Sequence, residues 1–169
     1  GEALSLPYCR DAGLQDWVAR TCATQAIDHA VVFSSVMAHY VPEKSSLPML
    51  VDFVDMDSAK WTQYAGTHRW PLSWLYRREG ARLLGFERAV AARAKHGFFV
   101  TEAERDLFLN AAPECAGQID AMGNGVDAEF FSPGHELHSP YRAGEIPVVF
   151  TGAMDYWPNV DAAVWFAGE

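Results

Sequence analysis

The chain contains one clear βαβ pattern, which begins with the apolar run Met49-Leu-Val-Asp-Phe-Val-Asp55. The run is short and rich in β-branched and aromatic residues, and such runs form strands. A long amphipathic segment from near Ser73 to Lys95 predicts a helix, and Gly97-Phe-Phe-Val-Thr101 predicts a second short strand. Two strands joined by a helix of this length pair in parallel. The pattern therefore predicts an α/β fold built on a mostly parallel sheet.

Elements of the same kinds precede this unit. Asp11 is placed to cap a helix that reaches about Thr24 and buries Leu14, Trp17 and Val18. Ala30-Val-Val-Phe-Ser34 predicts a buried strand. The long helix itself is expected to bury a stripe of side chains at helical spacing, namely Tyr76, Leu83, Val90 and Ala94.

Another helix and strand follow the unit. Thr101 and Glu104 have the spacing of a capping box, which predicts a helix that starts there and runs through Leu109. Gln118-Ile-Asp-Ala-Met122 predicts a further strand, and the turn signal Asn124-Gly125 closes it.

The composition changes near residue 132, which indicates a domain boundary. Ser132 to Glu145 contains two prolines and two glycines with almost no apolar periodicity, as is typical of a linker. Ile146-Pro-Val-Val-Phe-Thr151 then predicts a new strand, and Pro158 stands where the first turn of a helix tolerates proline. The order predicts a linker followed by the first βα unit of a second domain.

Composition excludes several classes of protein. The 169 residues are 50% apolar and carry 13 Lys+Arg against 22 Asp+Glu, a net charge of −9. This mixture is not that of a disordered or coiled-coil chain, and its acidity argues against general nucleic-acid binding. Three cysteines without C-x-x-C spacing favour a reducing cytoplasm. The chain starts without Met and stops within a predicted helix, so we expect an excerpt of a longer protein.

The strongest candidate for a catalytic or metal-binding motif is Asp55-Met-Asp57, which follows a predicted strand. Two carboxylates at the carboxyl edge of a sheet lie where α/β proteins bind ligands. The two carboxylates are compatible with three roles. One could be a nucleophile and the other an acid, as in haloacid-dehalogenase-like phosphatases, or both could bind a divalent metal ion. The third role is structural, as helix caps. The phosphatase also needs a downstream lysine to balance the phosphate charge. The only lysines are Lys44, Lys60 and Lys95, and none of them follows the later strands that end in threonine.

Three further patterns in the sequence bear on ligand binding. The turn Gly152-Ala-Met154 after a predicted strand lets N–H groups approach a phosphate. His135 and His138 lack the i, i+4 spacing of a helical zinc site, so no metal is expected. The long helix carries a basic arc, which is a solvated face or a surface for anionic lipid or a phosphorylated ligand; its members are Arg77, Arg78, Arg82, Arg88, Arg93 and Lys95.

Three segments together resemble family 4 retaining glycosyltransferases of the GT-B fold. They are Phe98-Phe-Val-Thr-Glu-Ala-Glu104, then Met122-Gly-Asn-Gly-Val-Asp127 with Phe130-Phe-Ser-Pro133, and Val148-Val-Phe-Thr-Gly-Ala-Met154 through Pro158-Asn-Val-Asp161. Within that family the sequence is most similar to the sugar transferases associated with exosortase (PEP-CTERM) export, which His29 to Val41 and Val51 to Trp61 also resemble.

The resemblance implies two Rossmann-like domains, with the acceptor on the first and the nucleotide sugar on the second. Residues 1–123 would be the later part of the acceptor domain, 124–145 the crossing, and 146–169 the start of the donor domain. It also implies that the loop Gly152, Ala153, Met154 lies against the donor diphosphate and that Asp55 faces the acceptor or the transferred sugar. The family often has a histidine near Asp55, and this chain has none there.

The resemblance thus implies a metal-independent hexosyltransferase that moves a sugar from a nucleotide donor to a polysaccharide or lipid-linked acceptor in exopolysaccharide or cell-envelope biosynthesis. It implies a cytoplasmic protein, at the inner face of the plasma membrane if the basic face Arg77–Lys95 contacts lipid. The Arg/Lys pair and Glu-x7-Glu motif of the donor domain are absent, so this chain alone is expected to be inactive. Glu79 and Glu87 have Glu-x7-Glu spacing in the wrong domain, and we interpret Glu87 as a buried structural pair. The alternatives are the phosphatase using Asp55 and Asp57, and a non-catalytic α/β interaction module.

Overall fold

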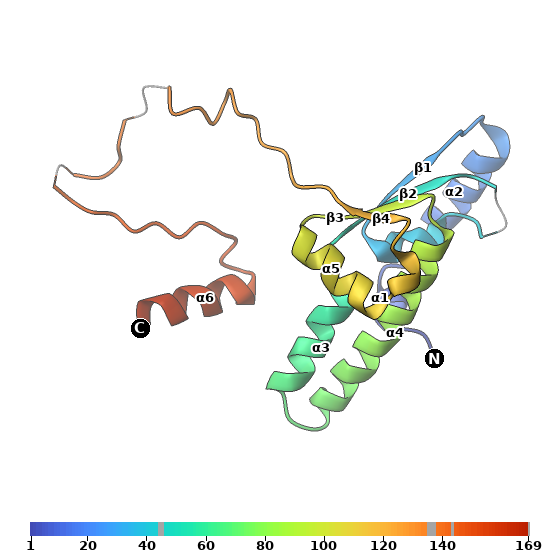
Figure 1. Ribbon diagram of the computed structural model, residues 1–169, viewed down its shortest axis with the longest axis horizontal. Coiled ribbons are helices and arrows are strands. Elements are labelled where there is room, and N and C mark those ends of the chain that lie inside the picture. The colour runs from blue at the N-terminus through green and yellow to red at the C-terminus, as the bar shows by residue number, and fades with distance from the viewer. Residues whose placement is uncertain (44–45, 135–137, 143, 169) are drawn as a thin grey trace. The chain divides into compact units, whose positions relative to one another are not determined.

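In the computed structural model of the protein, the described residues form a four-stranded sheet of order β1-β2-β3-β4 in which all neighbours are parallel (Figure 1). The strands are β1 (Ala30–Phe33), β2 (Met49–Val54), β3 (His96–Phe99) and β4 (Ile119–Ala121). Parallel neighbours require crossover connections, and helices supply two of the three. The prediction of an α/β fold on a Rossmann-like parallel sheet is therefore confirmed.

The structure describes residues 1–43, 46–134, 138–142 and 144–168. The chain divides into two compact units, Gly1–Gly125 and Val126–Glu169. The first unit holds the sheet and all described helices except α6 (Trp157–Gly168), which belongs to the second.

The helices of the first unit differ greatly in length. They are α1 (Ser5–Tyr8), α2 (Ala12–Thr24), α3 (Asp57–Thr67), α4 (Leu72–Arg93) and α5 (Glu102–Ala111), with short 3-10 helices η1 (Ser35–Tyr40) and η2 (Pro113–Cys115). The consecutive helices α3 and α4 form an antiparallel hairpin that extends away from the sheet (Figure 1).

Local sequence signals predicted the starts of α2 and α5 and the bounds of α4 correctly or nearly so. Asp11 accepts a hydrogen bond from the Leu14 backbone N–H at 2.7 Å and starts α2. Thr101 accepts one from the Glu104 N–H at 3.1 Å and starts α5. The long helix was predicted within two residues at each end. Helix α3 was not predicted from the sequence.

The core lies between one face of the sheet and the helices. Phe53, Phe99 and Phe108 are each at most 1% exposed, and their ring centroids are 5.0 to 5.8 Å apart. On α4, Leu83 and Val90 are buried and Tyr76 is half-buried. The predicted stripe is therefore correct, since Ala94 directly after the helix is buried as well.

Two predicted burial patterns are wrong. Leu14 and Trp17 are 36% and 57% exposed, because α2 packs mainly against η1 and not on the face of the sheet. In β1, Val32 is buried but Val31 and Phe33 are 78% and 69% exposed. β1 is the edge strand of the described sheet with one covered face, so its apolar residues alternate between core and surface.

The strand predicted at Ile146–Thr151 is also wrong. No described residue pairs with this segment, and Ile146 and Val148 are 94% and 76% exposed. An apolar run becomes a strand only when a neighbour satisfies its N–H and C=O groups, and Pro147 lacks an N–H altogether. The helix predicted after it does form, as α6 with Pro158 as its second residue.

Candidate functional site

The carboxyl end of β2 is bent sharply, and this bend places Asp55. The register with β3 shifts between Asp52 and Val54, so the strand carries a bulge. Val54 has a φ of 66°, and the Asp55 N–H donates to the Phe53 carbonyl at 2.9 Å, which closes a three-residue γ-turn. A β-branched residue adopts such a φ only under constraint, and constrained backbone of this kind concentrates at functional sites.

Lys60 pairs with both carboxylates of the predicted motif. Its Nζ lies 2.8 Å from Asp55 Oδ2 and 3.1 Å from Asp57 Oδ1, and all three side chains are about one-third exposed. Burial by itself lowers the pKa of Lys60, but the hydrogen bonds and charges of Asp55 and Asp57 outweigh it, so the pKa lies above its ordinary value. Lys60 is therefore a permanent cation here, and it leaves one Asp55 oxygen without a described partner.

The first turn of α3 is held by two glutamates from other helices. The Met56 N–H donates to Glu104 Oε2 at 2.7 Å, and the Ser58 N–H donates to Glu87 Oε1 at 3.1 Å. The Ser58 hydroxyl donates to the second Glu87 oxygen. Carboxylates suit the positive end of a helix. Because protein groups occupy these donors, they do not bind an external phosphate, which weighs against the phosphatase alternative.

Glu87 and Glu79 are both structural. Glu87 is 1% exposed, and burial raises its pKa to about 7 although its hydrogen bonds from Ser58 act in the opposite direction. Glu79, also 1% exposed, accepts from the N–H groups of Leu4 and Ser5 at 2.7 and 2.8 Å and so holds α1. The interpretation of Glu87 as a buried pair is confirmed, with Ser58 as its partner.

A cavity of about 540 Å³ opens beside the Asp57 side of this site. It lies among α1, η1, α3 and α4 and is mostly apolar, lined among others by Tyr8, Val36, Trp61, Leu75 and Tyr76, with Asp57 and Glu79 as its carboxylates. The rings of Trp61 and Tyr76 lie 5.4 Å apart at its wall. Apolar and aromatic walls with a few polar groups are typical of small-molecule sites.

The predicted donor loop belongs to the second unit. Gly152, Ala153 and Met154 are exposed and precede α6 directly. Asn159 Nδ2 donates to the Ala153 carbonyl at 3.0 Å, and a Cβ at Gly152 would lie 2.8 Å from the same nitrogen. The loop is thus folded against the first turn of the helix. Asp55 lies in the other unit, so the two predicted parts of the site are described separately.

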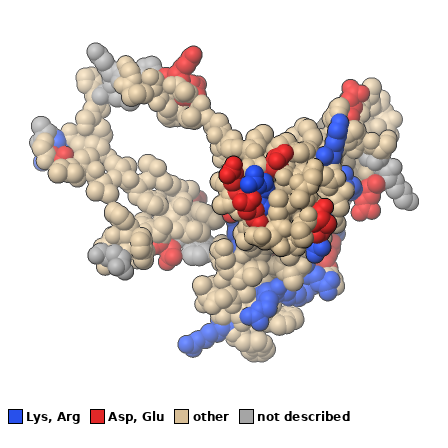
Figure 2. Space-filling model, viewed as in Figure 1, with Lys and Arg blue, Asp and Glu red and all other residues tan. Residues whose placement is uncertain are grey.

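Half of the predicted basic arc is engaged within the chain. Arg93 donates to the Ala38 carbonyl at 2.7 Å, Arg88 lies 2.6 Å from Glu114, and Arg78 donates to the Glu2 carbonyl at 3.2 Å. Arg77 and Arg82 are exposed and have no described partner. Figure 2 shows Lys and Arg gathered over α4 and at the end of the α3–α4 hairpin.

The described residues include neither a metal-ion cluster nor a membrane-spanning helix. They contain no group of three or more His, Cys, Asp or Glu side chains placed to hold a metal ion. No helix among them is long and apolar enough to cross a membrane. The pair His135 and His138 remains untested, because His135 lies outside the described residues.

Comparisons of the chain with protein-family models, with curated proteins and with solved structures found no match.

Sequence reasoning located Asp55 but missed its partners. Lys60 stands three residues after Asp57, a spacing at which helical side chains meet, so a helix prediction at 57–67 would have found this pair. Ser58, Glu87 and Glu104 are separated by 29 to 48 residues along the chain from the groups that they bind. No local signal connects them.

Proposed function

We propose that the chain is the acceptor-side part, with the start of the donor side, of a glycosyltransferase. The enzyme transfers a sugar from a nucleotide-sugar donor to a polysaccharide or lipid-linked acceptor in exopolysaccharide or cell-envelope biosynthesis. The observation that carries this proposal is the bent carboxyl end of β2, where Lys60 pairs with both Asp55 and Asp57 and Asp57 lines an aromatic-walled cavity. Ligands of parallel α/β sheets bind at this edge, and the segments that resemble glycosyltransferases surround it in sequence.

The chemistry of the edge suits an acceptor hydroxyl. Asp55 is a half-buried carboxylate paired with Lys60, and its second oxygen has no described partner. Such an oxygen accepts a hydrogen bond from a sugar or lipid-linked hydroxyl and orients it for attack. The walls formed by Trp61 and Tyr76 suit the apolar face of a sugar ring or an isoprenoid chain.

The donor half of the proposal depends on the second unit. The N–H groups of the loop Gly152–Met154 and the first turn of α6 are of the kind that binds a diphosphate without a metal. In the donor site of such an enzyme, positively charged groups stabilise the departing diphosphate. The Arg/Lys pair that does this in the family is absent from this chain, so the 169 residues alone should not turn over a nucleotide sugar.

The test replaces Asp55 by Asn in the full-length protein that contains this chain. We expect sugar transfer to fall about tenfold or more, because an amide no longer attracts the acceptor hydroxyl as a carboxylate does. The apparent KM for the nucleotide sugar should stay unchanged, since Asp55 is placed on the acceptor side. Transfer is measured with a radiolabelled donor, and circular dichroism verifies that the variant folds.

Asp106→Asn is the matched control, because Asp106 is also a surface carboxylate paired with a cation, Arg105. It should leave transfer unchanged. Magnesium-dependent phosphate release that is lost in Asp55→Asn would instead establish the phosphatase. Full transfer by Asp55→Asn, or turnover by the 169-residue chain alone, would contradict the proposal.

A further inference from the structure

We propose that the end of the α3–α4 hairpin binds the surface of an anionic lipid bilayer. This surface, the hairpin tip, comprises Arg69, Trp70, Leu72, Trp74 and Arg77. The proposal replaces the full Arg77–Lys95 arc by a smaller surface that is both aromatic and basic. It does not rest on the proposed glycosyltransferase activity.

The tip exposes large apolar side chains close together in the chain. Trp70, Leu72 and Trp74 are 81%, 44% and 60% exposed. A single exposed apolar side chain is ordinary, but three within five residues at the end of a projecting hairpin form a patch that marks an interaction site. Figure 1 shows the α3–α4 connection as the part of the first unit that extends farthest from its sheet.

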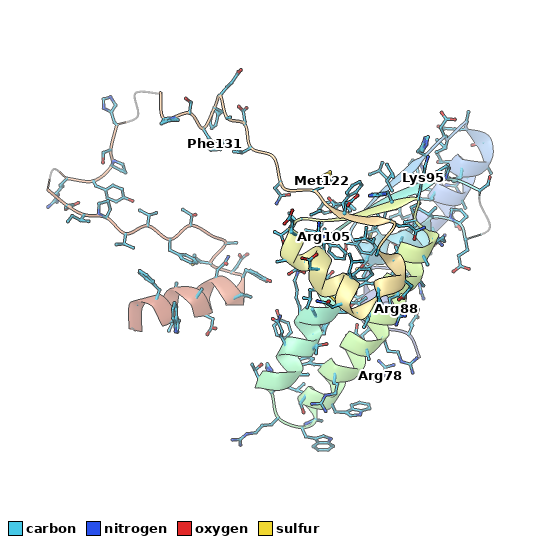
Figure 3. All side chains as sticks on the ribbon, viewed as in Figure 1. Arg78, Arg88, Lys95, Arg105, Met122 and Phe131 are labelled. Atoms are coloured by element: carbon cyan, nitrogen blue, oxygen red, sulfur yellow. The ribbon has the colours of Figure 1, made fainter. Side chains whose placement is uncertain are left out.

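Backbone hydrogen bonds tie the connection between the two helices to the start of α4. The Ser73 N–H donates to the Arg69 carbonyl and the Leu75 N–H to the Pro71 carbonyl, both at 3.1 Å, and α4 itself begins at Leu72. Trp74 and Arg77 are three residues apart on α4 and share one helix face, and Trp70 lies in the turn that leads into the helix. Figure 3 shows the large side chains at the hairpin end pointing outward, beyond the labelled Arg78.

The sequence around the hairpin tip is positively charged, whereas the chain as a whole is negatively charged. Residues 58–78 contain no Asp or Glu and four basic residues, whereas the whole chain has a net charge of −9. Arg69, Arg77 and the nearby Arg82 are exposed, and their guanidinium groups form no hydrogen bond or ion pair with any described residue. Figure 2 shows blue Lys and Arg side chains near the end of the α3–α4 hairpin. This local positive charge on an otherwise acidic protein favours an anionic partner for the hairpin tip.

Among anionic partners, a lipid surface fits the side chains best. Tryptophan combines an apolar ring with one N–H donor and settles at the level of lipid headgroups, while arginine keeps its guanidinium at the phosphates above buried methylenes. Leu72 at the extreme end supplies purely apolar area for the acyl boundary. Each basic residue near an anionic leaflet adds attraction that salt screens. A nucleic acid has phosphates but no apolar layer for Leu72.

The experiment is co-sedimentation of the 169-residue protein with vesicles of phosphatidylglycerol and phosphatidylcholine, against vesicles of phosphatidylcholine alone. We expect binding only to the anionic vesicles and weaker binding in high salt. The double variant Trp70→Ala/Trp74→Ala and the charge reversal Arg69→Glu/Arg77→Glu should each weaken binding about tenfold or more. Because these side chains are exposed, circular dichroism should show both variants folded.

The matched controls lie on α2, where Trp17 and Arg20 are also exposed. Trp17→Ala and Arg20→Glu should bind as the unchanged protein does. A third variant, Trp165→Ala/Phe166→Ala, tests the other exposed aromatic surface, on α6. Absence of vesicle binding, equal binding by the tip variants, or loss of binding only in the α6 variant would each overturn the proposal.

Discussion

Replacing Gly80 by Ala should destabilise the first unit by about 2 kcal/mol, although alanine favours helices more than glycine does. Gly80 lies where α4 crosses α3 most closely. A Cβ there would stand 2.7 Å from Thr62 Oγ1 and 2.9 Å from the Ser58 carbonyl oxygen. The second atom is backbone, so the helices themselves must separate. Overpacking of this kind costs about 1 to 3 kcal/mol or more, against about 1 kcal/mol gained in helix propensity.

The cost extends beyond the clash because Ser58 is also the residue that donates to Glu87. A shift of α3 lengthens those buried hydrogen bonds, and a buried carboxylate without partners is unfavourable. A larger side chain, as in Gly80→Val, should destabilise more strongly still. Urea denaturation followed by circular dichroism measures the free energy of unfolding of each variant.

The same helix offers a matched control in Gly85. A Cβ at Gly85 meets no atom within 4 Å, so Gly85→Ala should stabilise the protein by up to about 1 kcal/mol. The two glycine-to-alanine changes are thus expected to have opposite signs. Stabilisation by Gly80→Ala comparable to that by Gly85→Ala would contradict the close contact of α3 with α4.

Replacing Glu87 by Gln should change the pH dependence of stability by about 3 kcal/mol. Burial raises the pKa of Glu87 from an ordinary 4.5 to about 7, so the folded protein binds this proton more tightly than the unfolded chain. The contribution of Glu87 to the free energy of unfolding therefore falls as pH rises from 4.5 to about 7 and is constant above that. A difference of this size in pKa corresponds to about 3 kcal/mol.

Glutamine is neutral at every pH, so the Glu87→Gln variant does not lose free energy of unfolding as the pH rises. Its amide oxygen can still accept a hydrogen bond from the Ser58 N–H. The stability of the variant relative to the unchanged protein should therefore improve by about 3 kcal/mol between pH 4.5 and pH 8. Urea denaturation at a series of pH values measures it. Glu102→Gln, which removes an exposed carboxylate on α5, corrects for the change in net charge. Parallel stability curves for Glu87→Gln and the unchanged protein would refute the buried ionisable state of Glu87.

Sequence patterns located those elements whose signals are local. The caps Asp11 and Thr101 are defined by one hydrogen bond across three residues, and both formed as predicted. The four strands of the sheet were predicted within about two residues because each is a short apolar run between polar turns. The long helix α4 was found because its buried residues repeat at helical spacing over 22 residues.

Predictions that depended on neighbours failed. Val31 and Phe33 have the same composition as core residues, and only their position on an edge strand exposes them. Ile146–Thr151 has strand-like residues without a described strand to pair with. In the candidate site, the position of Asp55 followed from the end of β2, but the bulge, the γ-turn at Val54 and the pairing of Glu87 with Ser58 arise only after the elements pack.

The strand order has a consequence for how the chain acquires its structure. Along the described sheet, each strand pairs with the strand that directly precedes it in the chain, from β1 to β4. The longest connection between two partner strands is the one from β2 to β3, residues 55–95, and most of it folds locally as the α3–α4 hairpin. The entropy cost of closing a loop grows only slowly with its length. During synthesis from the N-terminus the four described strands can pair one at a time as the chain leaves the ribosome, and the last of them is available once Ala121 has emerged.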